Sequence, residues 1–198
     1  MLASYFQKDH VEAGCDEAGR GCLAGPVFAA AVIFPRDFQN EDLNDSKALT
    51  AEKRYILREL IEREAIAYAV GQVSVEEIDE INILNASFLA MHRALDILAI
   101  QAEYLLIDGN RFNAYKSVPH QCIVQGDGKY LSIAAASILA KTYRDDHMVR
   151  LAEEFPQYGW KDNKGYATEK HRKSLLAHGS CKHHRKAFIR KVFEVELL

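Results

Sequence analysis

The chain has few cysteines and no apolar run long enough to cross a membrane. None of its four cysteines forms a C-x-x-C pair, which argues against a zinc knuckle or a dithiol redox motif. Reduced, structural thiols are the expected state. No apolar stretch reaches the roughly 18 residues that a spanning helix needs. The first ten residues also lack the basic-then-apolar order of a signal peptide. We therefore expect a cytoplasmic protein without membrane contact.

The charges are distributed unevenly along the chain. The net charge of the 198 residues is −3, but residues 160–198 carry ten Lys or Arg against four Asp or Glu. This basic segment also contains Tyr166, His183 and His184, and it suits a polyanionic partner such as nucleic acid. We expect the two histidines to contact phosphate or solvent. A solvated basic helix face is an equal alternative. We expect one globular unit, with a main domain over 1–159 and a basic helical extension over 160–198 packed on it.

Hydrophobic patterning predicts alternating strands and helices. The apolar run 27–34 reads as a strand, and Thr50 is a plausible N-cap for a helix that ends near Glu64. Strands at 65–75, 104–107 and 121–125, consecutive helices from 75 to 101, and a long helix over 131–155 complete the prediction. Three strands without a long crossover, followed by alternating elements, indicate a mixed α/β sheet.

Two adjacent carboxylates precede a Gly-Arg-Gly turn near the N-terminus. Asp16 and Glu17 lie within G-C-D-E-A-G-R-G-C-L at 14–23. Carboxylates between apolar segments are costly to desolvate, so they suggest metal binding or acid–base work. Glycines on both sides of Arg20 let a ligand approach the backbone, and the guanidinium can meet phosphate. An acidic turn with an exposed arginine is the alternative, and this segment alone does not decide.

Two further carboxylates follow predicted strands. Asp108 comes after the strand at 104–107, and Asp127 comes after the one at 121–125. Asp-Gly is itself a common turn signal, so either acid taken singly has an ordinary explanation. Ligand sites in such sheets gather at strand ends, which would bring four acids into one cleft. Oxygen ligands without His or Cys favour Mg²⁺ or Mn²⁺, and a pair of such ions suits phosphoryl displacement.

Six ordered motifs resemble the type 2 ribonucleases H, in particular the bacterial ribonuclease HII family. They are D-E-A-G-R-G at 16–21, D-S-K at 45–47, I-D-G at 107–109, Q-G-D at 125–127, S-I-A-A-A-S-I-L-A-K at 132–141 and K-G-Y at 164–166. The resemblance runs from about Val11 to about Phe188. It implies a ribonuclease H-like fold: a five-stranded mixed sheet flanked by helices, with a small helical C-terminal region. The implied activity is metal-dependent cleavage of RNA in RNA–DNA hybrids and incision 5′ to single ribonucleotides in duplex DNA, leaving 3′-hydroxyl and 5′-phosphate ends.

The resemblance also implies roles for individual residues. Asp16, Glu17, Asp108 and Asp127 are the implied catalytic carboxylates and the ligands of two Mg²⁺ or Mn²⁺ ions. The turn formed by Gly19, Arg20 and Gly21 is implied to sense the ribose 2′-hydroxyl through its backbone. Tyr166 matches a tyrosine that packs on the next sugar, with an aromatic hinge for the C-terminal segment as its alternative. Lys47 is a candidate phosphate contact, although a surface lysine before a helix is also possible. Ser137 and Lys141 are further candidates to face the substrate.

Other readings of the same residues remain open. A related nuclease that acts on DNA only, or a ribonuclease HIII, would share much of the pattern. A non-enzymatic nucleic-acid binding protein would explain the basic segment and Tyr166 but not four acids at strand ends. The expected partner is an RNA–DNA hybrid or a DNA duplex containing ribonucleotides, and we expect a monomer.

Overall fold

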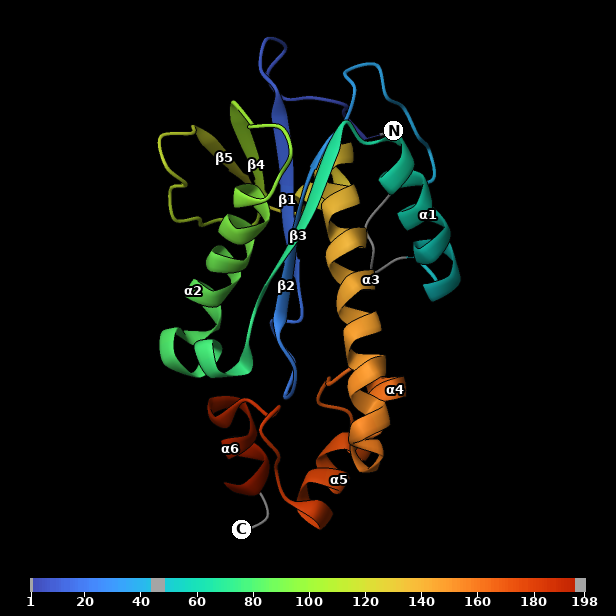
Figure 1. Ribbon diagram of the computed structural model, residues 1–198, viewed down its shortest axis with the longest axis vertical. Helices are drawn as coiled ribbons and strands as arrows, with labels where there is room; N and C mark the ends of the chain where they lie inside the picture. The colour runs from blue at the N-terminus through green and yellow to red at the C-terminus, as the bar shows by residue number, and fades with distance from the viewer. Residues whose placement is uncertain (1, 44–48, 195–198) are drawn as a thin grey trace.

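A five-stranded mixed sheet lies at the centre of the protein in the computed structural model, which describes residues 2–43 and 49–194 (Figure 1). The strands are β1 (Glu12–Ala18), β2 (Val27–Ile33), β3 (Ala67–Val73), β4 (Tyr104–Asp108) and β5 (His120–Ile123), in the order β3-β2-β1-β4-β5. β1, β2 and β3 form an antiparallel meander, whereas β4 and β5 run parallel to β1. The predicted fold class is confirmed.

The all-apolar sequence of β2 explains its central place. Every residue of V-F-A-A-A-V-I is buried, and successive side chains enter opposite faces of the sheet. Ala29 and Ala31 belong to the core under α2 (Val75–Asp96), whereas Ala30 and Val32 belong to the core under α3 (Leu131–Glu154). Helices α2 and α3 thus cover the two faces, with α1 (Ala51–Glu64) outside α3 (Figure 1).

The helix boundaries follow the local signals closely. Thr50 caps α1 as predicted, because its hydroxyl oxygen accepts a hydrogen bond from the Lys53 amide at 3.2 Å. The two helices predicted between 75 and 101 are both present under the single label α2: the first opens with a capping box between Ser74 and Glu77, and the two meet at Asn82, whose backbone is not helical (φ 67°). The second helix ends at Asp96, five residues earlier than predicted. None of the described helices is long and apolar enough to span a membrane.

A small helical region packs on the far end of α3 (Figure 1). It consists of a 3₁₀ turn at Pro156–Tyr158 and helices α4 (Trp160–Asn163), α5 (Glu169–His178) and α6 (Lys186–Glu194). Trp160, Leu175 and Ile189 share an apolar cluster with Met148 and Leu151 of α3. This contact joins the two parts of the chain, while the division at 159/160 stays a prediction.

A chain of buried hydrogen bonds organises this region. The Trp160 indole donates to Nε2 of His171 at 3.0 Å, so that nitrogen accepts and Nδ1 of His171 donates to the Tyr166 carbonyl at 2.9 Å. Nε2 of His184 lies 3.2 Å from Nε2 of His171, and Nδ1 of His184 accepts from the Cys181 amide at 3.1 Å. Both imidazoles are therefore neutral. His184, which we expected at phosphate or solvent, is instead buried because its ring completes this chain.

We expect the protein to lose stability as the pH falls below 6.5. Burial and the neighbouring His171 ring lower the pKa of His184 from 6.5 to about 4. Between pH 6.5 and 4, His184 binds a proton in the unfolded chain but stays neutral in the folded protein. The free energy of unfolding therefore decreases as the pH falls through this range. Urea unfolding at pH 7.5, 6 and 5 measures this slope. His184→Gln should flatten it, and an equal slope in that variant would contradict the assignment.

Candidate active site

One cavity gathers residues from β1, β4, α1, α3 and the C-terminal region. It is lined by Asp16, Glu17, Ala18, Gly19, Arg20, Gly21, Arg54, Asp108, Ser137, Lys141 and Tyr166. Of the nine site residues predicted from the sequence, seven line this cavity. Lys47 lies outside the described residues, and Asp127 does not line the cavity.

The parallel pairing of β1 with β4 brings two carboxylates together. Cys15 is paired with Ile107, and the next residues along the two strands are Asp16 and Asp108. Asp16 is 4% exposed. Its burial, and then the charges of Glu17 and Asp108, raise the pKa of Asp16 well above its usual range. Negative charge is therefore concentrated around a buried carboxylate, where a bound cation would relieve the repulsion.

The acids are held by the surrounding backbone and by one arginine. The Glu17 amide donates to Asp16 Oδ1 at 2.7 Å, and the Gly126 amide donates to Asp108 Oδ1 at 2.7 Å. Arg20 pairs with Glu17 at 3.0 Å. The Arg20 side chain is 51% exposed, whereas that of Glu17 is 11% exposed, so the guanidinium reaches from the surface into the cavity.

Asp127 lies beside the cavity, in a 3₁₀ turn at Gly126–Gly128. The prediction that it follows directly on a strand is wrong: β5 ends at Ile123, and Gln125 takes a left-handed conformation with φ 55° that turns the chain out of the sheet. The Asp127 side chain is buried, and the preceding residue, Gly126, donates to Asp108. Asp127 thus follows directly on Gly126, the residue whose amide binds the Asp108 carboxylate.

The glycine turn and Tyr166 form the other side of the cavity. Gly19 has φ 97°, and a Cβ there would overlap the side chain of Arg144. Glycine is required for both reasons. Cys22, just after this turn, forms an isolated antiparallel bridge with Tyr166. Tyr166 is 38% exposed, and the centre of its ring lies 5.1 Å from Lys141 Nζ.

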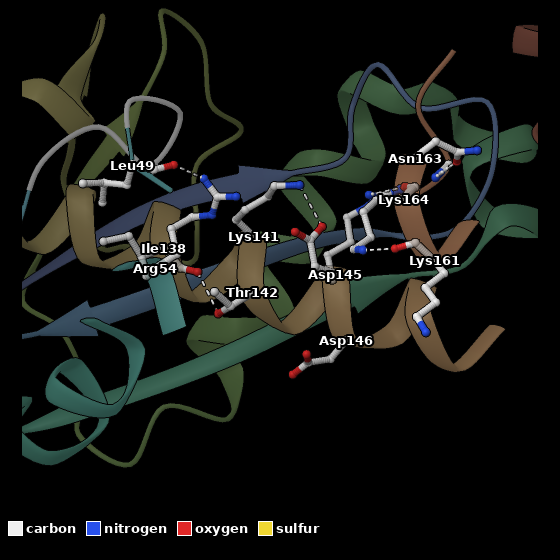
Figure 2. A network of polar contacts seen from close by, with 12 residues as sticks. Leu49, Arg54, Ile138, Lys141, Thr142, Asp145, Asp146, Lys161, Asn163 and Lys164 are labelled. Atoms are coloured by element: carbon white, nitrogen blue, oxygen red, sulfur yellow. Dashed lines mark hydrogen bonds and ion pairs between the residues drawn. The ribbon is translucent and has the colours of Figure 1, made fainter. Parts of the chain in front are cut away.

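Three polar residues of the cavity lining, Ser137, Lys141 and Arg54, are not among the nine predicted site residues. Ser137 and Lys141 follow each other by one turn of α3, and the hydroxyl of Ser137 lowers the pKa of Asp16 through a hydrogen bond. Lys141 Nζ is 2.7 Å from Asp145 Oδ1, and Arg54 of α1 donates to the Leu49 carbonyl at 2.6 Å (Figure 2). The sequence carries no signal for Arg54, because it is one of several charged residues in the first turns of α1.

The donor set suits a hard divalent cation. The acidic lining offers carboxylate oxygens, and the lining of this cavity contains neither His nor Cys. Among residues 2–43 and 49–194, no three His, Cys, Asp or Glu side chains already form a group that could hold a metal ion. A cation bound at Glu17 would compete with the Arg20 guanidinium, which lies 3.0 Å from that carboxylate.

The family model described as Ribonuclease HII matches residues 13–195 of this chain. The chain belongs to the ribonuclease HII family. Ribonuclease HII of Bacteroides thetaiotaomicron is 67% identical over 188 residues, which cover 95% of this chain and 94% of that protein. Ribonuclease HII of Cytophaga hutchinsonii is 55% identical over 197 residues, which cover 99% and 98%. The protein is thus an enzyme of the ribonuclease H class, the metal-dependent endonucleases that act on RNA–DNA hybrids.

Solved structures of ribonucleases HII and HIII share the fold. Ribonuclease H2 of Pyrococcus horikoshii has a TM-score of 0.75 at 24% identity and covers 93% of this chain and 97% of its own. Ribonuclease HII in the PCNA complex of Archaeoglobus fulgidus has a TM-score of 0.71 at 26% identity, with 89% and 94% covered. Bst-RNase HIII in complex with Mn²⁺ has a TM-score of 0.68 at 19% identity, and only 69% of that chain is covered.

Proposed function

We propose that this ribonuclease HII hydrolyses the RNA strand of RNA–DNA hybrids and incises on the 5′ side of single ribonucleotides in duplex DNA, leaving 3′-hydroxyl and 5′-phosphate ends. The observation that carries the proposal is the shared cavity, in which Asp16, Glu17 and Asp108 face the glycine turn and Tyr166. The three acids alone would fit any metal-dependent enzyme that hydrolyses phosphate esters. Their position beside a glycine backbone and an exposed aromatic ring adds a surface that can read a sugar.

The proposed ligands of two Mg²⁺ or Mn²⁺ ions are Asp16, Glu17, Asp108 and Asp127. Such ions supply, when bound, Lewis-acid stabilisation of the charge that develops at the phosphorus and the departing oxygen. The protein's own part is to place carboxylates and exclude water. Asp16 and Asp108 are fixed by the backbone amides of Glu17 and Gly126, so their orientation does not depend on the cation. Glu17 differs from them in that its carboxylate pairs with the side chain of Arg20 at 3.0 Å.

Selectivity for ribose is proposed to reside in the turn at Gly19–Gly21 and in Tyr166. The 2′-hydroxyl distinguishes the two sugars, and a glycine backbone can bond it without a side chain in the way. A backbone group left unpaired by deoxyribose would cost roughly 1–3 kcal/mol. Arg20, Arg54 and Lys141 line the same cavity and are suited to the phosphates on either side. We further propose that the enzyme acts as a monomer in the cytoplasm.

Cleavage of three matched duplexes with and without metal tests the proposal. We expect incision of an RNA–DNA hybrid and of a DNA duplex with one ribonucleotide in Mg²⁺ or Mn²⁺, and no product in a chelator. The matched all-DNA duplex should stay intact under every condition. Gel mapping against alkaline hydrolysis markers locates the cut, which should fall 5′ to the ribonucleotide. Cleavage of the all-DNA duplex would favour a DNA nuclease, and binding without cleavage would favour a binding protein.

A further inference from the structure

Two arginines near the cavity are completely buried. Arg144 of α3 and Arg185, just before α6, both have 0% exposure. Neither forms an ion pair with the residues that the structure describes, whereas Arg58 of α1 pairs with both Glu62 and Asp146. Burying a guanidinium is costly, and burial lowers the pKa of Arg185 to about 10. An apolar side chain would fill the same space at less cost.

In the part of the chain that the structure describes, Arg144 forms hydrogen bonds with backbone carbonyls only. Its Nε donates to the Pro26 carbonyl at 3.1 Å, its Nη2 to the Ala24 carbonyl at 3.0 Å and its Nη1 to the Lys164 carbonyl at 2.9 Å. One guanidinium thereby joins the segment after the glycine turn to the segment that carries Tyr166. The planar fork is what permits three such bonds in fixed directions.

Arg185 holds the same segment from another side. Its Nη1 donates to the Arg20 carbonyl at 2.9 Å, which lies inside the glycine turn itself. Its Nε and Nη2 both donate to the Gly25 carbonyl, at 2.9 and 2.8 Å. The turn and the residues up to Pro26 therefore rest on two buried cations that come from α3 and from the C-terminal region.

Arg144 and Arg185 lie where the glycine turn and the segment that carries Tyr166 come together. Arg144 fills the space where Gly19 would carry a Cβ, and its Cζ lies 5.7 Å from the centre of the Tyr166 ring. The backbone adds a direct link, because the Leu23 amide donates to the Gly165 carbonyl at 2.8 Å. A shift of either guanidinium would move the glycine turn and Tyr166 relative to each other.

We propose that Arg144 and Arg185 are positioning residues. They hold the glycine turn and Tyr166 in a fixed relative position for recognition of the ribose. This inference rests on the proposed function of the cavity. The arginines do not touch the substrate. They fix the distance between a backbone that bonds the 2′-hydroxyl and a ring that packs on the neighbouring sugar, and misplacement of such groups by about 1 Å can cost a hundredfold in rate.

Arg144→Lys tests the proposal, because it keeps the charge but replaces the fork by one ammonium group. We expect the single-turnover rate at a lone ribonucleotide to fall about 10- to 100-fold. The Kd for an all-DNA duplex should change less than about threefold, since phosphate contacts remain. Arg58→Lys is the matched control: it removes a guanidinium that binds two carboxylates away from the cavity, and its cleavage rate should stay within about twofold of the wild type. A wild-type rate per folded Arg144→Lys molecule would overturn the proposal.

A double variant separates positioning from general stability. If Arg144 acts through Tyr166 and the turn, Arg144→Lys should cost much less in a Tyr166→Ala background than in the wild type. If the loss of rate in the double variant equals the product of the losses in the two single variants, the two residues act independently and the proposal is overturned. Circular dichroism and melting temperature establish folding for each variant. Arg185→Lys serves if Arg144→Lys does not fold, and failure of both to fold would assign the pair to stability alone and overturn the inference.

Cleavage by the wild-type enzyme distinguishes a failure of the positioning role from a failure of the proposed function. Absence of cleavage of any ribonucleotide-containing duplex by the wild type would reject the proposed function itself. Cleavage by the wild type, together with equal cleavage by Arg144→Lys, would reject only the positioning role.

Discussion

Replacing Asp16 with asparagine is expected to lower the cleavage rate at least a thousandfold while the protein stays folded. Asp16 is the most buried of the three acids that line the cavity, and it lies between the charges of Glu17 and Asp108. Asn keeps the shape and can still accept the hydrogen bond from the Glu17 amide, but it loses the charge that binds a cation. A thousandfold loss corresponds to about 4 kcal/mol of transition-state stabilisation, a plausible share for a ligand of a catalytic metal.

The same substitution should stabilise the metal-free protein. The raised pKa of Asp16 means that the folded state holds this proton more tightly than the unfolded chain does. The charged form therefore costs stability, and this cost appears as the pH rises above the ordinary aspartate value of about 3.9. Asp16→Asn removes it, so the gain in melting temperature over the wild type should be larger at pH 7.5 than at pH 5, measured in a chelator.

The exposed Asp37 provides the control for this experiment. Asp37→Asn makes the same chemical change on the surface, and it should alter neither cleavage nor the pH dependence of melting. Wild-type turnover by Asp16→Asn at saturating Mg²⁺ would remove Asp16 from the metal site. A large drop in its melting temperature would instead show that the carboxylate supports the fold.

Replacing Tyr166 with alanine should depress cleavage at a single ribonucleotide about 10- to 100-fold and leave the melting temperature nearly unchanged. The backbone of Tyr166 is held independently of its ring, by the Asn163 carbonyl, the Thr168 amide and His171. The ring itself is partly exposed at the cavity, so its loss opens no large internal void. Aromatic contacts with nucleic acid are typically worth about 1–3 kcal/mol, which sets the expected size of the effect.

Tyr166→Phe shows which part of the side chain matters. If the ring packs on a sugar, Phe should retain most of the activity, and the loss in Tyr166→Ala should be greater at a single ribonucleotide than within an RNA–DNA hybrid. Single-turnover rates on both substrates measure this ratio. A strongly lowered melting temperature with normal activity per folded molecule would identify Tyr166 as an aromatic hinge instead.

The sequence predicts the sheet and the acidic centre well, because both depend on local patterns. Continuous apolar runs identify β2 and β4 as buried strands, and the end of β4 identifies Asp108. Asp16 was predicted at a strand end, but it lies inside β1, which continues to Ala18 because the antiparallel pairing with β2 extends that far. Asp127 shows the limit of that logic. The chain leaves β5 through the left-handed Gln125, a conformation that no hydrophobic pattern reveals, so the acid lies in a turn rather than at a strand end.

Buried charges are the part that the sequence could not predict. Arg144 lies in the charged half of α3, where periodicity indicates solvent, and Arg185 lies in a basic run that suggests a polyanion. Both point inward because carbonyls of residues 20–26 and 164 need donors there. Those carbonyls belong to irregular segments whose paths are set by tertiary packing. Arg54 was missed for the related reason that its place beside the cavity depends on how α1 packs against α3.

The most direct test of the account is metal rescue of a phosphorothioate. A duplex carries sulphur in place of a non-bridging oxygen at the phosphate 5′ to its single ribonucleotide, as separate stereoisomers. If the acids hold ions against that phosphate, cleavage of one isomer should be strongly suppressed in Mg²⁺ and largely restored in Mn²⁺, which accepts sulphur more readily. Restoration should be absent in Asp16→Asn. Equal cleavage of the sulphur and oxygen substrates in Mg²⁺, or suppression that Mn²⁺ does not relieve in either isomer, would contradict metal contact at the scissile phosphate.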